Sequence, residues 1–165
     1  MLHGVEIREA AAVDWPAIWP ILRAIAAAGE TYTWPVDITE EAGRAVWMKA
    51  PPGRTFVAID EGVLVGTAYL KPNQDGNGSH VANAAFLVDP ARSGRGVARA
   101  LCDRVLAEAK RDGYRAMQFN AVVEANTRAV ALWRSYGFEV LATIPEAFRH
   151  PVHGYVGLHV MYRTL

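Results

Sequence analysis

The chain has 165 residues, of which 52% are apolar and 21% charged, and its 17 basic and 17 acidic side chains give a formal net charge of zero. This length is typical of one domain, and we expect a single domain over residues 1–165. The absence of a basic excess argues against nucleic acid as the main partner, because phosphate binding usually needs clustered Lys and Arg.

Two further observations bear on where the chain works. The single cysteine, Cys102, lies in a predicted helix and cannot form an internal disulfide, which is typical of a reducing cytosol. Residues 1–6 lack the charged and apolar regions of a signal peptide, and no apolar run approaches the ~20 residues of a membrane span. We therefore expect a cytoplasmic location and no membrane partner.

Apolar periodicity and turn residues predict seven strands and four helices, taken here in chain order. The strands are expected at residues 5–8, 55–59, 63–70, 81–88, 116–123, 139–144 and 155–162. The helices are expected between Asp14 and Gly29, from Thr39 to about Ala50, from about Gly96 to Asp112, and from Asn126 to Gly137. One strand, two helices, three strands, then helix, strand, helix and two strands predict an α+β fold with a mixed sheet.

A glycine-containing loop, Ser93-Gly94-Arg95-Gly96-Val97-Ala98, joins the fourth predicted strand to the third helix. The first N–H groups of a helix lack partners and carry partial positive charge, and the two glycines let a ligand approach the backbone closely. The loop is therefore suited to a pyrophosphate. Three arginines would add positive charge: Arg92, Arg95 and Arg99. A turn with solvated arginines is the alternative for an isolated Gly-x-Gly.

Two common nucleotide-binding loops are excluded here. A P-loop needs Gly-Lys-Ser or Gly-Lys-Thr, which the chain lacks. A Rossmann loop would have a small residue where Arg99 stands and would lie near the start of the domain.

A second motif follows in residues 126–138, which read Asn-Thr-Arg-Ala-Val-Ala-Leu-Trp-Arg-Ser-Tyr-Gly-Phe. The two motifs together resemble the GNAT family of N-acetyltransferases. That family has Gln or Arg, two residues, Gly, one residue and Gly or Ala before a long helix, and later an Asn, a short helix and Gly-Phe. Ser93 replaces the usual Gln or Arg. The order and separation match, and the resemblance runs from about Thr55 to the C-terminus.

The resemblance implies a mixed, mostly antiparallel sheet of six to seven strands, with about four helices on both faces and a splay between the fourth and fifth strands. It implies acetyl-CoA as co-substrate; no metal is expected, because no His, Cys and Asp side chains stand at metal-binding spacing. Backbone groups of Phe86, Leu87 and Val88 would bind the pantetheine arm as an added strand would. The remaining residues implied to bind acetyl-CoA are Ser93, Gly94, Arg95, Gly96, Val97, Ala98, Arg99, Asn126 and Trp133.

A narrower resemblance concerns the acceptor. Residues 81–84, 118–122, 124–126 and 145–149 are similar to the branch that acetylates azetidine-2-carboxylate, a ring-contracted proline analogue. This likeness implies an acceptor site of Asn83, Asn120 and Asn126. Family likeness also places Tyr32 and Trp34 in the acceptor wall, with a loop anchored to the core as the alternative.

Asn83 and Asn120 lie in predicted strands between apolar residues, where an amide without partners costs ~1–3 kcal/mol. Each either serves a polar, catalytic pocket or bonds to local backbone. Asn126 is also in position to act as a helix N-cap.

Candidates for proton transfer are less defined. Glu124 follows the fifth strand and is the leading candidate for the general base, with Glu30 and His80 as others; a solvated surface group is the alternative for each. The family often has a Tyr where Trp133 stands, and Trp offers no titratable proton. Tyr136 is the nearest phenol in sequence, with core packing as its alternative role.

The sequence therefore predicts an N-acetyltransferase that moves acetyl from acetyl-CoA to a small amine, an amino acid or proline-analogue imino acid, by direct attack in a ternary complex. The alternatives are an amine drug, a polyamine or a protein N-terminus as acceptor, or a non-catalytic acyl-CoA-binding module. His150 and His153 lack a companion Cys, so zinc is not expected. The apolar C-terminal strand would allow a homodimer, by analogy with the family.

Overall fold

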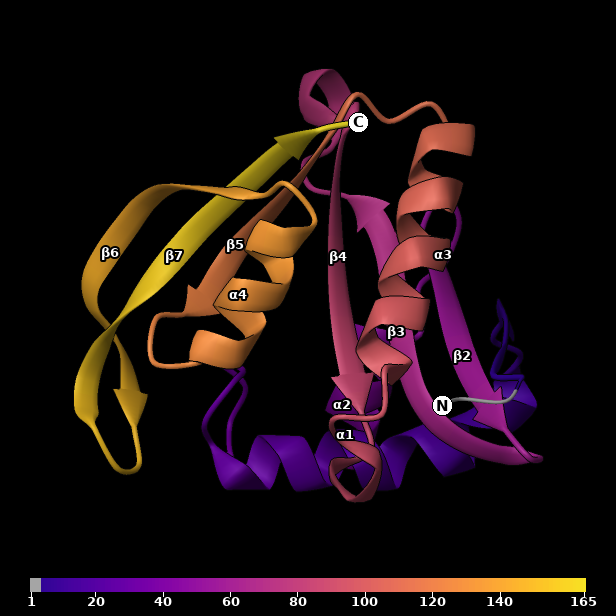
Figure 1. Ribbon diagram of the computed structural model, residues 1–165. Coiled ribbons are helices and arrows are strands. Elements are labelled where there is room, and N and C mark those ends of the chain that lie inside the picture. Colours follow the sequence, from indigo (N-terminus) through magenta and orange to yellow (C-terminus); the bar gives the residue numbers. More distant parts are fainter. Residues whose placement is uncertain (1–3) are drawn as a thin grey trace.

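The computed structural model describes residues 4–165 and contains one seven-stranded sheet in the order β1-β2-β3-β4-β5-β7-β6 (Figure 1). The strands are β1 (Glu6–Glu9), β2 (Arg54–Asp60), β3 (Val63–Pro72), β4 (Val81–Val88), β5 (Ala116–Val123), β6 (Glu139–His150) and β7 (Gly154–Thr164). The helices are α1 (Trp15–Ala28), α2 (Glu40–Trp47), α3 (Val97–Arg111) and α4 (Thr127–Ser135). Only β4 and β5 pair in parallel, which confirms the predicted mixed, mostly antiparallel α+β fold.

The predicted splay lies between β4 and β5. These strands pair only through Val81 with Ala116 and Ala82 with Met117, and then diverge (Figure 1). The Asn83 side chain lies at the fork, where its Nδ2 donates to the Gln118 carbonyl at 2.9 Å. A side chain thus forms the last bond between the two strands before the gap opens.

Two apolar cores cover the two faces of the sheet. Along β2, Phe56 packs with α3, whereas Val57 packs with α1 and α2, because successive strand side chains point to opposite faces. Leu22 of α1 and Trp47 of α2 are fully buried on the second face. Burial of an aliphatic or Phe side chain contributes about 1.5–3 kcal/mol, so both helix layers are held mainly by packing.

Helix α2 ends at Trp47, earlier than the predicted Ala50. The Thr55 hydroxyl explains the early end, because it donates to the Trp47 carbonyl at 2.9 Å and accepts the Lys49 N–H at 3.0 Å. These bonds tie the chain after the helix to β2, and Met48 is extended there, with φ −81° and ψ 101°. Within residues 4–165, no helix is both long and apolar enough to cross a membrane.

Strand β6 is longer than the predicted 139–144 and continues to His150. It is the outermost strand next to β7, a position where Pro145 removes no bond that the sheet needs. A register shift between Ile144 and Phe148 absorbs the proline, and Glu146 takes a positive φ of 53° there. The result is a long β6–β7 hairpin at the sheet edge.

Candidate active site

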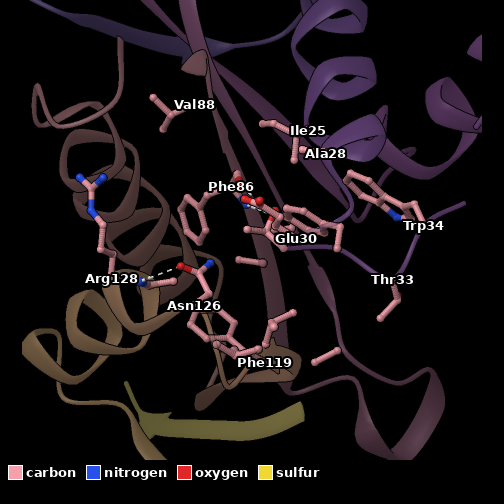
Figure 2. A pocket seen from close by; sticks show the side chains of 18 of the residues that line it. Ile25, Ala28, Glu30, Thr33, Trp34, Phe86, Val88, Phe119, Asn126 and Arg128 are labelled. Carbon is pink, nitrogen blue, oxygen red and sulfur yellow. Dashed lines mark hydrogen bonds between the residues drawn. The ribbon is translucent and has the colours of Figure 1, made fainter. Parts of the chain in front are cut away.

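A cavity of about 700 Å³ opens where β4 and β5 separate. Figure 2 shows its two sides, with Glu30 and Trp34 from the loop after α1 facing Asn126 and Arg128 from the start of α4. Glu30 and Arg128 are the charged side chains of the lining. The predicted gap is therefore a real cavity with one carboxylate and one guanidinium.

The glycine loop forms one end of the cavity. Gly94 and Gly96 have φ values of 80° and 82°, in the left-handed region that favours glycine. A Cβ on Gly94 would have Arg128 Nη2, at 3.7 Å, as its nearest neighbour, so the loop backbone is open to a ligand. Ser93 lines the cavity, whereas Val97 is buried in the core behind the loop.

The arginine that lines the cavity beside this loop is one that the sequence analysis missed. Arg92 points to Asp60 at 3.9 Å, and the Arg99 guanidinium lies 5.7 Å from the centre of the Tyr136 ring. Arg95 is exposed on the loop. Arg128, from α4, lines the cavity and approaches Gly94 instead. The sequence held one signal for Arg128. It stands two residues after Asn126, in the first turn of a helix whose start was predicted to line the pocket.

Backbone groups of alternate β4 residues face the gap. The Asp89 N–H donates to the Val65 carbonyl of β3 at 2.9 Å, so odd-numbered residues of this strand direct their backbone groups toward β3. Phe86 and Val88 therefore turn theirs toward the cavity. Leu87 pairs with β3 and has a buried side chain, which corrects the expectation that its backbone would bind pantetheine.

The Phe86 backbone has a partner across the gap. The Tyr32 hydroxyl accepts the Phe86 N–H at 3.1 Å and donates to the Phe86 carbonyl at 2.6 Å. The Tyr32 ring stacks on Trp34, with centroids 4.2 Å apart and planes 7° from parallel. Burial raises the pKa of Tyr32 above its usual value, so the phenol stays neutral and can both donate and accept. Both aromatic residues line the cavity, as predicted.

An aromatic cluster closes the inner wall. The Trp133 ring lies 5.0 Å from Phe86 and 4.8 Å from Phe119, measured between centroids. Trp133 is 9% exposed and lines the cavity, where the sequence placed it. This part of the wall is apolar and offers no titratable proton.

The predicted asparagines reach the cavity, yet their amides have protein partners. Asn83 is 8% exposed; its Nδ2 donates to Gln118, and its Oδ1 accepts the Tyr69 hydroxyl at a long 3.4 Å. Asn120 is exposed and bonds side chains, donating to Asn73 at 2.7 Å and accepting from Gln118 Nε2 at 3.0 Å. Each amide nitrogen therefore has one N–H assigned and one left over.

Asn126 combines the two positions expected for it. Its Oδ1 accepts the Ala129 N–H at 3.4 Å, which makes it the N-cap of α4. The same side chain lines the cavity beside Arg128 (Figure 2).

Two predicted catalytic residues lie outside the lining. Glu124 is exposed after the end of β5, and its Oε2 would lie 2.9 Å from a Cβ placed on Gly157 of β7. The Tyr136 hydroxyl donates to Asp103 at 2.8 Å on α3, and burial together with this bond raises the pKa of Tyr136. The geometry thus turns both groups away from the cavity, a correction to their expected roles. Glu30, the secondary candidate, lines it.

His80 and His150 lie outside the cavity lining. His80 is exposed, and His150 Nδ1 accepts the N–H groups of Val152 and His153 at 3.1 and 3.2 Å. Among residues 4–165, no cluster of three His, Cys, Asp or Glu side chains could hold a metal ion.

Known proteins share this architecture. A GCN5-related N-acetyltransferase from Kribbella flavida is 54% identical, with a TM-score of 0.94 and 98% of each chain covered. A phosphinothricin acetyltransferase from Sinorhizobium meliloti, solved with AcCoA, is 23% identical, with a TM-score of 0.85 over 98% of this chain and 88% of that one.

A sequence relative and a family model give the assignment. N-acetyltransferase aca1 from Schizosaccharomyces pombe is 36% identical over 98 residues, which is 59% of this chain and 47% of that protein. The chain thus spans about half the length of this curated relative. The model of the acetyltransferase (GNAT) family matches residues 8–138. This match covers most of the chain and both predicted motifs up to Phe138, and the chain therefore belongs to the acetyltransferase (GNAT) family.

Proposed function

We propose that this chain transfers the acetyl group of acetyl-CoA to the amine of a small molecule by direct attack in a ternary complex. The observation that carries the proposal is the cavity itself, which has an open glycine loop and Arg128 at one end and the Glu30 carboxylate in the same lining. Such a cavity suits a long anionic donor and a separate amine.

The residues present fit acetyl-CoA. Phosphate oxygens would accept N–H groups at the start of α3 and the Arg128 guanidinium, in line with the positive end of a helix. Phe86 and Val88 turn backbone groups toward the gap, where an extended arm would pair as an added strand. The fold shared with the Sinorhizobium meliloti protein, solved with AcCoA, supports this donor.

Proton removal from the amine falls to Glu30 in this proposal. It is the carboxylate in the lining, whereas Glu124 is outside it. Acetyl-CoA supplies an activated thioester carbonyl, and the amine nitrogen bonds to its carbon as the carbon–sulfur bond breaks. Glu30 takes the proton from the amine, directly or through water. The leaving thiolate keeps the electron pair and is protonated by solvent, since Trp133 has no proton to give.

We further propose an α-amino or α-imino acid as acceptor, azetidine-2-carboxylate being the type suggested by the sequence. One N–H of each amide on Asn83 and Asn120 is left over and could donate to an acceptor carboxylate. A polyamine would need several carboxylates, and among residues 4–165 the lining has only that of Glu30. The stacked Tyr32 and Trp34 rings offer an apolar wall for a small ring.

The test is acetyl-CoA-dependent release of the CoA thiol over a panel of amino acids, proline analogues, polyamines and amine drugs. We expect release with azetidine-2-carboxylate or another α-amino or α-imino acid, and a loss of that activity in Asn83→Ala and Asn120→Ala. If no compound of the panel caused thiol release while the protein still bound acetyl-CoA, the proposal of a small-molecule acceptor would be overturned. A protein N-terminus as acceptor, or a non-catalytic binding module, would then be favoured.

Location and assembly are part of the same proposal. The one cysteine, buried Cys102, suits a cytoplasmic protein. The β6–β7 hairpin exposes Leu141, Ile144 and Tyr155, which supports a homodimer through this edge. Light scattering coupled to gel filtration measures the mass, and a monomer at micromolar concentration would contradict the dimer.

A further inference from the structure

We infer that the Tyr32 hydroxyl is a gate on the open edge of β4, which acetyl-CoA must displace before the acceptor binds. The inference rests on the proposed function, because it gives the displaced contact a ligand. It concerns the loop of residues 29–38 between α1 and α2, which carries Tyr32, Trp34 and Glu30.

The gate occupies the groups that a strand-like ligand arm needs. Tyr32 takes both the N–H and the C=O of Phe86, at 3.1 and 2.6 Å. A phenol offers one donor and one acceptor, the same pair that an amide of an extended arm would offer to one residue of β4. Both partners cannot bond the Phe86 groups in the same way at once. An arm that pairs there must therefore move the phenol away.

The closed contact is stable in the free protein. The two bonds between Tyr32 and Phe86 are part-buried at the cavity wall, and opening the gate without a ligand would exchange both for bonds to water or leave the two Phe86 groups without partners. Stacking on Trp34, whose ring packs edge-on against Trp47 at 6.0 Å, holds the phenol in place. When the binding-competent form is a small fraction of the molecules, the observed affinity falls by that fraction.

Opening the gate also changes the acceptor side. Tyr32 and Trp34 stack face to face, so a shift of the phenol disturbs the Trp34 ring in the same loop. Gly29, with a φ of 67°, ends α1 in a left-handed conformation directly before this loop. Glu30, the proposed base, follows it. Binding of acetyl-CoA thereby rearranges the wall that these two rings offer to the acceptor, and the acceptor binds second.

The first experiment compares acetyl-CoA affinity of the wild type and Tyr32→Phe by calorimetry. The phenylalanine keeps the ring on Trp34 and removes only the hydroxyl. We expect acetyl-CoA to bind about tenfold tighter to Tyr32→Phe, because the two competing hydrogen bonds are gone. Unchanged or weaker binding by Tyr32→Phe, beside normal binding by the wild type, would overturn the gate. A wild type that binds no acetyl-CoA would overturn the proposed function itself.

Thr67→Val is the matched control. Its buried hydroxyl also makes one donated and one accepted bond, to the Phe56 carbonyl at 2.7 Å and from Trp47 Nε1 at 2.9 Å, but it does not line the cavity. We expect this variant to melt at a lower temperature and to bind acetyl-CoA like the wild type. A tenfold gain in Thr67→Val as well would show a general loosening and would overturn the specific role of Tyr32.

The second experiment follows the order of binding by tryptophan fluorescence. Acetyl-CoA alone should change the emission of the wild type, and most of this change should vanish in Trp34→Phe, which separates the loop signal from that of Trp133. The acceptor alone should give no change at concentrations that saturate the enzyme in the presence of acetyl-CoA. Equal acceptor affinity with and without acetyl-CoA would contradict the gate.

Discussion

The two ends of the cavity hold their polar groups in opposite ways. At the glycine loop, Gly94 and Arg128 lie open to solvent, and Arg128 takes part in none of the ion pairs formed among residues 4–165. At the β4 end, the groups of Phe86 and the Asn83 amide are bonded to Tyr32 and Gln118. A ligand gains new contacts at the first end, whereas at the second it must exchange existing ones. Affinity should therefore come from the loop end and selectivity from the β4 end.

The largest effect is expected for Glu30→Gln, in the loop whose Tyr32 bonds to Phe86 at the β4 end. We expect kcat/KM to fall by about 10²–10⁴, because the amine loses its general base, while acetyl-CoA binding is unchanged. Initial rates with a saturating donor measure the effect. Glu124→Gln is the control, since Glu124 is a carboxylate outside the lining. A large loss in Glu124→Gln and none in Glu30→Gln would reverse the assignment.

At the loop end, Arg128→Ala should raise the Kd of acetyl-CoA by about tenfold to hundredfold, the effect of losing a charge-assisted hydrogen bond. The difference from the wild type should shrink in high salt. Calorimetry at two salt concentrations gives both numbers. Arg134→Ala removes an exposed arginine from the far end of the same helix and should leave the Kd as it was. An unchanged Kd in Arg128→Ala would place the phosphates elsewhere.

Tyr136→Phe separates a structural phenol from a catalytic one. Loss of the bond to Asp103 should lower the melting temperature by about 2–4 °C, as about 1 kcal/mol does in a chain of this size. Turnover should stay within about twofold of the wild type, because the Tyr136 hydroxyl contacts α3 and lies outside the cavity. A tenfold fall in kcat with normal stability would restore Tyr136 as the acid for the thiolate.

The smallest effect is expected at Cys102, on the helix that follows the glycine loop. Burial raises the pKa of Cys102 to about 12, so at pH 8 the thiol is almost wholly protonated and the reactive thiolate is scarce. Iodoacetamide at pH 8 should leave the native enzyme active and unmodified, and should label it in urea. Mass spectrometry counts the adducts. Rapid inactivation of the folded enzyme would contradict direct transfer without a covalent intermediate on the protein.

Features set within a few residues could be read from the sequence. The Asn126 cap and the need for glycine at positions 94 and 96 follow from local backbone geometry. The place of Trp133 in the cavity wall came from the family resemblance. The α+β order and the gap between the fourth and fifth strands were also predictable. The family resemblance predicted the gap, and the short β4–β5 pairing confirms it.

Contacts between distant segments could not be read in this way. The partner of Phe86 is 54 residues away, in a loop whose path depends on how α1 packs. Tyr136 shares a helical face with Trp133 by spacing, but it lies at the end of α4 with φ −94° and ψ 8°, and its phenol reaches α3. The place of Arg128 after the Asn126 cap could have put it in the cavity wall, but its approach to Gly94 depends on how the fold brings α4 to the glycine loop.

The bond from Asn83 to Gln118 has a consequence for the depth of the gap. The parallel ladder ends after Ala82, and one side-chain amide takes the place of the next rung. A strand rises about 3.3 Å per residue, so moving this rung by one residue pair would deepen or shorten the cleft by that step. The depth of the cleft is then set in steps by single residues on the two strands. Substitutions at these residues are therefore a direct way to change the size of the acyl group that the cleft accepts.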